Sequence, residues 1–237
     1  IKMKRSLFHL ALVSFLLGGC VSYNHKIIPI TPLHPLPKIK TSAHYTLEME
    51  RDLGASEQDF RKIDDFLDSV EKRVTLKLNY SKEDAEKILK IINEETKKLF
   101  DIYEKGSIFY TSLRTGKADC DRYAIPYMSA AERLNLPLKA IFAQGGKRII
   151  SNVETNAESH FFVRWKFENS YQKWINCECE NGRLMLDDYY KDYISLTEIP
   201  NFRDWCIRTR LDWCAKAYST NYLSAVIKSR ELRREVK

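Results

Sequence analysis

The sequence lacks the features that mark several common classes of protein. After residue 20 no apolar run is long enough to span a bilayer, so an integral membrane protein is not expected. No basic stripe is interleaved with aromatic residues, and the charged tail at residues 228–237 is typical of a solvated helix end, so we expect no nucleic-acid partner. The six cysteines include no CxxC pair, so neither a metal nor another cofactor is expected.

Residues 1–19 are unlike the rest of the chain. We expect translation to start at Met3, followed by a short positive region and an apolar run at residues 6–17, which has the length of a secretory signal. The run closes with Leu17-Gly18-Gly19-Cys20, which resembles the lipobox of bacterial lipoproteins. The alternative is an ordinary signal peptide with a chance cysteine, but the small residues before Cys20 favour the lipobox.

This resemblance implies that residues 1–19 are removed as a signal peptide and that Cys20 is lipidated. The acyl chains would anchor the protein to a membrane of the bacterial cell envelope, with the folded part outside the cytoplasm. Val21 after the cysteine is compatible with the outer membrane if the organism has two membranes. Four prolines within residues 20–45 predict a semi-stiff tether from the anchor to the fold.

Residues 46–115 are predicted to form a helical N-terminal layer. Capping boxes open two of its helices, at Ser56 with Asp59 and at Ser81 with Asp84, and apolar residues recur at helical spacing after each. The pattern shows no residues with an evident chemical role, so this layer is expected to serve packing.

Residues 116–200 are predicted to form the core, and the fold class is α+β. A helix is expected at residues 119–134, and Gly145 with Gly146 predicts a turn after the first strand. Aromatic and β-branched residues indicate strands at residues 138–143, 160–167 and 171–179. Residues 201–237 are predicted to form a C-terminal helical extension.

Histidine is scarce, and its positions leave one candidate for a catalytic base. His9 lies in the predicted signal peptide, His25 and His34 lie in the tether, and His44 lies at the tether's end. His160 is therefore the only histidine expected inside the folded region. Because an imidazole titrates near neutral pH, it is the usual general acid and base of a hydrolytic site.

Strand pairing suggests a carboxylate partner for His160. If the two strands form a hairpin whose turn centres on Asn169, His160 lies opposite Glu178, with Cβ atoms about 4.5–5.5 Å apart. Glu178 would then accept the imidazole N–H and fix the orientation of the ring. Asn176 lies on the same face and is the alternative orienting residue. A shift of one residue would break this pairing.

Cys120 is the candidate nucleophile. It follows Asp119, a good N-cap residue, at the start of a predicted helix, where the helix macrodipole lowers the pKa of a thiol. A thiolate in this position attacks amide or ester carbonyls. Pro126 falls early in the helix and should kink it or delay its start.

The remaining cysteines leave the disulfide pattern open. Disulfides are permitted outside the cytoplasm, and four thiols would be free to pair if Cys20 is lipidated and Cys120 is a nucleophile. Their connectivity does not follow from the sequence. The four residues are Cys177, Cys179, Cys206 and Cys214.

Taken together, these residues resemble the transglutaminase-like superfamily, whose members share a papain-like fold. In that family the nucleophile heads a helix, the histidine begins a strand, and the acid lies four residues after a tryptophan. The resemblance covers about residues 110–195. The matching segments are Asp119-Cys120-Asp121-Arg122-Tyr123-Ala124, Leu136-Pro137-Leu138, His160-Phe161-Phe162-Val163-Arg164-Trp165, Trp174-Ile175-Asn176-Cys177-Glu178, Gly182 and Asp187-Asp188-Tyr189-Tyr190.

The resemblance implies a core in which the nucleophile helix packs on a small antiparallel sheet. It also implies a thiol acyl-transfer enzyme that acts on an amide of a protein or peptide, as a peptidase, amidase or protein cross-linker. Cys120 would be the nucleophile, His160 the general acid and base, and Glu178 the orienting group. The alternative is a non-catalytic binding or scaffold lipoprotein, because fold does not imply function.

Overall fold

The computed structural model describes residues 39–105, 108–150, 153–167, 174–217 and 222–236. The predicted signal peptide, Cys20 and the tether as far as residue 38 lie outside these residues. In the described part of the chain, no helix is both long and apolar enough to cross a membrane. The predicted lipid anchor therefore stays a prediction.

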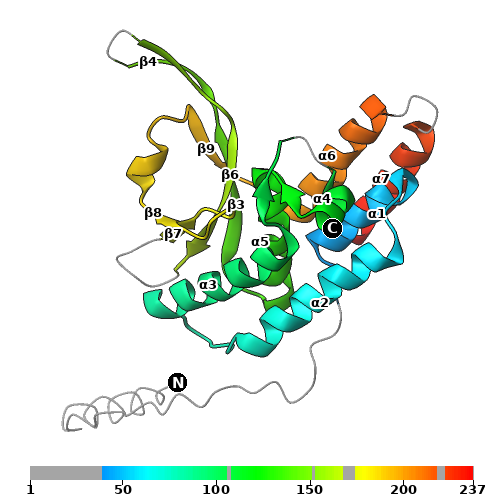
Figure 1. Cartoon of the computed structure of the whole chain (residues 1–237), viewed down its shortest axis with the longest axis horizontal. Coiled ribbons are helices and arrows are strands. Elements are labelled where there is room, and N and C mark those ends of the chain that lie inside the picture. The colour runs from blue at the N-terminus through cyan, green and yellow to red at the C-terminus, as the bar shows by residue number, and fades with distance from the viewer. Residues whose placement is uncertain (1–38, 106–107, 151–152, 168–173, 218–221, 237) are drawn as a thin grey trace, which may run out of the picture.

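The chain folds as α+β, as the sequence predicts, with most helices gathered beside a small antiparallel sheet (Figure 1). Both capping boxes in the N-terminal layer are present, so α2 and α3 begin where the sequence indicates. The helices are α1 (Ser42–Glu50), α2 (Glu57–Arg73), α3 (Lys82–Leu99), α4 (Phe109–Thr115), α5 (Cys120–Leu134), α6 (Phe202–Ala217) and α7 (Tyr222–Glu235), with short 3-10 turns η1 (Arg51–Leu53) and η2 (Asp187–Tyr190).

The sheet that carries the central region has the strand order β8-β7-β6-β3-β9, and each neighbouring pair is antiparallel. Its strands are β3 (Leu138–Gln144), β6 (His160–Lys166), β7 (Trp174–Cys177), β8 (Leu184–Met185) and β9 (Ser195–Glu198). A separate short pair, β1 (Ile102–Tyr103) with β2 (Lys117–Ala118), is parallel.

The turn predicted at Gly145 and Gly146 is wrong. Gly146 is the first residue of β4 (Gly146–Ile150), which pairs with β5 (Val153–Ala157) as a two-stranded ribbon beyond the sheet (Figure 1). An added Cβ at Gly146 would meet the side chain of Ile194, so this glycine allows a close approach between the two residues.

Helix α5 is the centre of the packing. Nearly every one of its residues is buried, which is expected for a helix covered on all sides. It packs on β6, whose inward residues Phe161, Val163 and Trp165 belong to the same apolar cluster. Helices α1, α2 and α3 cover its other sides. The head of α5 is therefore held by several elements at once.

The predicted tether extends too far along the chain. Residues 41–45 were assigned to it, but Thr41 and Ser42 are fully buried and α1 starts at Ser42. The reason is a long-range contact, since the N–H and hydroxyl of Ser42 each donate to the Glu132 carboxylate of α5 at 2.6 Å. His44 is consequently inside the fold, and the expectation that His160 is the only such histidine is wrong.

His44 serves the start of α1. Its Nδ1 accepts the N–H of Thr41 at 3.1 Å, and its Nε2 lies 3.3 Å from Asp64. Burial lowers the pKa of this imidazole, and the carboxylate of Asp64 only partly offsets that effect. Both ring nitrogens are thus engaged in helix capping and packing.

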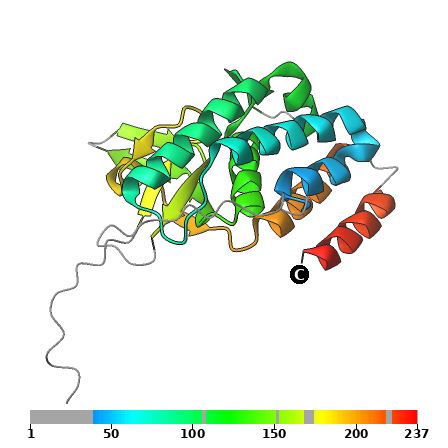
Figure 2. The ribbon, with the colours of Figure 1, turned by 90° about the horizontal axis from the view of Figure 1, so that it is seen from below.

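The C-terminal helices stand at the end of the molecule away from the sheet (Figure 2). Helix α6 packs against α1 and α7. Trp205 of α6 contacts Phe161 of the sheet, with ring centroids 4.8 Å apart. The side chains of Trp213 and Cys214 lie outside the described part.

Candidate active site

Cys120 lies at the first position of α5. Asp119 before it has the extended backbone of an N-cap residue, and β2 ends at Ala118. The delayed helix start expected from Pro126 is wrong, because α5 begins at Cys120 and contains the proline. The helix start therefore places the thiol where the first backbone N–H groups have no intrahelical acceptor.

His160 is the first residue of β6, and it pairs with Ala143 of β3. Its Nε2 lies 2.5 Å from Oε2 of Glu178. The imidazole side chain is 19% exposed and the Glu178 side chain 7%. The two residues therefore share a largely desolvated contact, in which a carboxylate fixes the ring more firmly than it would in water.

The predicted register of β6 and β7 is wrong by two residues. Arg164 pairs with Asn176 and Val163 pairs with Cys177, so Glu178 is not directly opposite His160. Because side chains alternate with a period of two, a shift of two residues keeps Glu178 on the face of His160. The predicted turn centre at Asn169 lies outside the described residues.

Glu178 is held by a turn that follows β7. Its N–H donates to the carbonyl of Arg183 at 2.9 Å, and its own carbonyl accepts the N–H of Gly182 at 2.7 Å. Gly182 has a φ of +74°, and an added Cβ there would lie 2.5 Å from Cγ of Asn93. Only glycine fits this position, and the turn aims the carboxylate back at His160.

Tyr190 is a fourth member of the group, and the sequence analysis gave it no role. It ends η2, and its hydroxyl donates to Oε1 of Glu178 at 2.5 Å. Its ring stacks on Phe162 with centroids 4.0 Å apart. The only sequence signal was its place in the Asp187-Asp188-Tyr189-Tyr190 segment. With Tyr190 on one oxygen and His160 on the other, both carboxylate oxygens of Glu178 are occupied.

Asn176 is engaged elsewhere. Its Oδ1 accepts from Nε of Arg164 at 2.8 Å, and its Nδ2 donates to Asp187 at 2.7 Å. Trp174 donates to the same Asp187 carboxylate at 2.7 Å. Of the two orienting residues proposed from the sequence, the structure brings Glu178 to His160 and places Asn176 in a neighbouring polar cluster.

The pKa of His160 depends on both the Cys120 thiol and the Glu178 carboxylate. Burial lowers the pKa of His160, but hydrogen bonds with the side chains of Cys120 and Glu178 and their charges outweigh it and raise the pKa to about 10. Since Nε2 faces Glu178, Nδ1 is the nitrogen left for Cys120. A thiol and a carboxyl side chain on the same imidazole form the order of groups that nucleophilic cysteine chemistry requires.

Two tyrosines flank this site. Tyr103 pairs with Ala118 across the β1–β2 ladder, two residues before Cys120. Burial and then the nearby charge of Cys120 raise the pKa of Tyr103 to about 12. Tyr193 stacks on the His160 ring with centroids 6.4 Å apart. The charge of Cys120 also contributes to a raised pKa of Tyr193, so both tyrosines lie near the thiol.

The other described cysteines are buried free thiols. Burial raises the pKa of Cys177 and of Cys206 to about 12 each, and that of Cys179 rises for the same reason. The disulfides that the sequence permitted therefore do not involve these three residues, and the side chain of Cys214 lies outside the described part. Cys120 is partly exposed, so it is the described thiol best placed to react.

Comparison with known proteins adds no relative. No family model, no curated protein and no solved structure matches this chain. Among the described residues no group of three or more His, Cys, Asp or Glu side chains could hold a metal ion. The transglutaminase-like resemblance therefore rests on the residues themselves, and we carry it forward as a proposal.

Proposed function

We propose that this chain is a thiol acyl-transfer enzyme of the transglutaminase-like type, with a papain-like core, that acts on an amide of a protein or peptide. Cys120 is the nucleophile, His160 the general acid and base, and Glu178 the orienting group. The observation that carries the proposal is a single imidazole that lies 2.5 Å from the Glu178 carboxylate through Nε2 and whose pKa is raised by hydrogen bonds with the side chains of both Cys120 and Glu178.

The reaction follows from this arrangement. The Cys120 thiolate attacks the amide carbonyl carbon, and the resulting oxyanion is stabilised by backbone N–H groups at the head of α5 that include that of Cys120. The C–N bond breaks as His160 gives its proton to the leaving amine, which leaves a thioester on Cys120. Water or a second amine then attacks the thioester while His160 takes up the proton, and the thiolate is released.

Glu178 and Tyr190 support the histidine in this cycle. A carboxylate that accepts the Nε2–H keeps the ring in the tautomer and orientation that direct Nδ1 at sulfur. The Tyr190 hydroxyl holds the carboxylate in turn. The pair therefore stabilises the imidazolium without itself taking part in proton transfer.

We also propose that the enzyme is anchored in the bacterial cell envelope through lipidated Cys20, on the outer membrane if the organism has two. The support is the Leu17-Gly18-Gly19-Cys20 sequence after an apolar run. Its substrate would then be a protein or peptide of the envelope. Mass spectrometry of the N-terminal peptide from native membranes tests the acyl chains directly.

Labelling of Cys120 by a chloroacetamide probe, resolved by peptide mass spectrometry, tests the catalytic assignment. We expect Cys120→Ala to abolish labelling at this peptide and His160→Gln to slow it by about tenfold or more, because the imidazolium partner of the thiolate is lost. Glu158→Gln is the matched control, since Glu158 is exposed and lies two residues away. Equal labelling of wild type and His160→Gln would sink the assignment and favour a non-catalytic scaffold.

A further inference from the structure

A buried group of charges surrounds the residue after Cys120. Asp121 contacts the guanidinium of Arg122, and Nη1 of Arg122 also lies 3.3 Å from Asp119. These residues flank the thiol on both sides in the first turn of α5. The proposed mechanism uses none of their side chains, so their burial beside the nucleophile calls for another explanation.

The second cation of this region comes from far along the chain. Arg210 of α6 is 1% exposed, and its Nη2 lies 3.6 Å from Oδ2 of Asp121. Its Nη1 lies 3.6 Å from Glu50, a carboxylate of α1 that is fully buried. Arg210 thus joins the head of α5 to two helices outside the central core.

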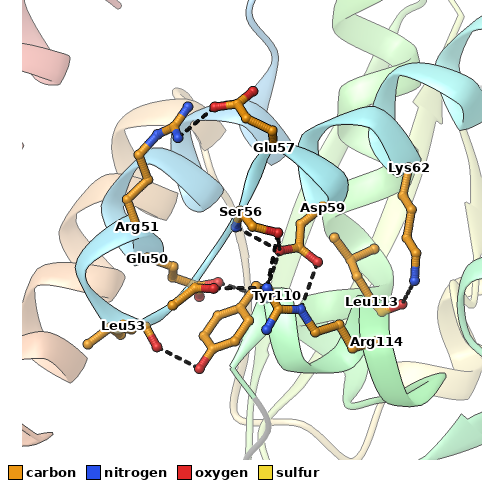
Figure 3. A network of polar contacts seen from close by, with 11 residues as sticks. Glu50, Arg51, Leu53, Ser56, Glu57, Asp59, Lys62, Tyr110, Leu113 and Arg114 are labelled. Atoms are coloured by element: carbon orange, nitrogen blue, oxygen red, sulfur yellow. Dashed lines mark hydrogen bonds and ion pairs between the residues drawn. The ribbon is translucent and has the colours of Figure 1, made fainter.

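Glu50 extends the connection to a fourth helix. Its carboxylate accepts the backbone N–H groups of Phe109 at 3.1 Å and Tyr110 at 2.8 Å, which open α4 (Figure 3). Burial raises the pKa of Glu50, and the charge of Arg210 is the largest effect that opposes the rise. Glu50 is therefore fixed by α4 and offers Arg210 a rigid anionic anchor.

The contacts of Arg210 are ionic without being hydrogen bonds. Among the described residues none of its three guanidinium nitrogens has a hydrogen-bond partner. The fork geometry that makes arginine hard to replace is thus unused at this site. Its charge, buried where the effective dielectric is low, is the property that matters to Asp121.

We propose that Arg210 is a positioning residue, which from the C-terminal helix α6 holds Asp121 and the first turn of α5 in the arrangement that keeps Cys120 reactive. The inference rests on the proposed function and deepens it, because it makes α6 a working part of the site. Without this cation the Asp121 carboxylate is balanced by Arg122 alone. The excess negative charge then disfavours a thiolate at the neighbouring residue.

The test must consider every charged group that faces the thiol. At the head of its own helix these are Asp119, Asp121 and Arg122, and from other elements they are Tyr103, His160, Glu178, Cys179 and Tyr193, with Arg210 and Glu50 behind Asp121. In the single variants at position 210 all of these other groups are kept, so a difference in the pH profile reports the charge of Arg210.

The experiment measures alkylation of Cys120 by iodoacetamide between pH 5 and 10 in the full chain, resolved by peptide mass spectrometry. For Arg210→Met we expect the rate at pH 7 to fall about threefold or more, as half a pKa unit changes the thiolate fraction. The profile should move to higher pH. Arg210→Lys should restore it, because the point charge is kept.

Arg203→Met is the matched control. Arg203 is also on α6 and also pairs with α5, through Glu132 at 3.2 Å, but at the opposite end of that helix from Cys120. A merely structural role of α6 predicts the same pH profile for both methionine variants. We expect Arg203→Met to keep the wild-type profile, and equal profiles for all variants would overturn the proposal.

Loss of a buried cation can prevent folding, so a second variant is needed. Glu50→Gln/Arg210→Met removes both charges of one pair, so no buried charge is left unbalanced, and the glutamine oxygen keeps an acceptor for one of the two N–H groups of α4. This double variant should fold and should still show the raised profile, and a wild-type profile would overturn the proposal. Alkylation requires no substrate. A wild type that transfers no acyl group, with a shifted Arg210→Met profile, would therefore reject the proposed function alone.

Discussion

At the scale of single residues, the site depends on a carboxylate whose two oxygens have different partners. Oε2 of Glu178 lies 2.5 Å from Nε2 of His160, and Oε1 accepts a hydrogen bond from the Tyr190 hydroxyl at 2.5 Å. A buried carboxylate with one unmet oxygen would be destabilised or would turn toward another donor. Tyr190 therefore decides whether Glu178 is held in a position to orient the histidine.

Replacement of this tyrosine gives a direct prediction. Tyr190→Phe keeps the ring that stacks on Phe162 but removes the donor to Glu178. We expect the free energy of unfolding to fall by about 1.5–3 kcal/mol, the range for a hydrogen bond to a charged group. Urea denaturation measures this loss, and amide turnover should fall with it.

Tyr189→Phe is the natural control for this change. Tyr189 is the adjacent residue, but it is 56% exposed. Removal of an exposed hydroxyl should leave stability within about 0.5 kcal/mol of wild type. Comparable losses in both variants would show that the contact with Glu178 contributes nothing measurable.

At the scale of elements, a buried carboxylate of α2 connects that helix to α4. Asp59 of α2 accepts the N–H of Ser56 at 2.8 Å and also receives two nitrogens of Arg114, at 3.0 and 2.6 Å (Figure 3). One side chain thus caps α2 and fixes the end of α4. The hydrogen bonds from Ser56 and Arg114 outweigh the effect of burial and lower the pKa of Asp59.

We expect Asp59→Ala to destabilise the fold by about 2 kcal/mol or more, because a helix cap and a charge-assisted hydrogen bond are lost together. Thermal or urea denaturation measures the change. Glu57→Ala is the matched control, since Glu57 lies in the same turn but is 71% exposed at its side chain. If the two variants melted alike, Asp59 would have no part in joining α2 to α4.

The sequence predicts best those features that depend on neighbouring residues. The capping boxes at Ser56 and Ser81 were read correctly because the bonds involved span three residues. The start of α1 was missed because it depends on Glu132, which lies 90 residues from Ser42. Hydrogen bonds between residues close in sequence can be predicted from local motifs, whereas the burial of a residue depends on the tertiary fold.

The same distinction holds for the candidate site. Cys120 was proposed from helix capping and family pattern, and His160 from family pattern and from an elimination that failed for His44. Glu178 was proposed from strand pairing, and face alternation keeps it on the face of His160 although the register was wrong. Tyr190 and Arg210 reach the site from η2 and α6, and no spacing in the sequence predicts those approaches. Their roles depend on how the sheet and the C-terminal helices pack, which only the folded chain shows.

At the scale of the whole molecule, the pH dependence of stability is set partly by His44, in the first helix of the fold. Nδ1 of His44 accepts the N–H of Thr41, which only an unprotonated nitrogen can do. Because burial lowers the pKa of His44 below 6.5, the unfolded chain binds a proton more readily than the folded one. His44 therefore contributes stability above pH 6.5 that is lost as the pH falls through its folded pKa.

We expect His44 to lower the free energy of unfolding of the wild type as the pH falls from 7 to 5, by at most about 1.4 kcal/mol per pH unit. His44→Gln should remove that contribution. His160 contributes with the opposite sign, because its pKa is raised to about 10 in the folded chain while the unfolded imidazole titrates near pH 6.5, so its stabilisation grows as the pH falls. His160→Gln should therefore lose stability more steeply than the wild type over this range. Urea denaturation at pH 7, 6 and 5 measures the three slopes. Parallel slopes for wild type and His44→Gln would mean that protonation of His44 does not weaken the start of α1.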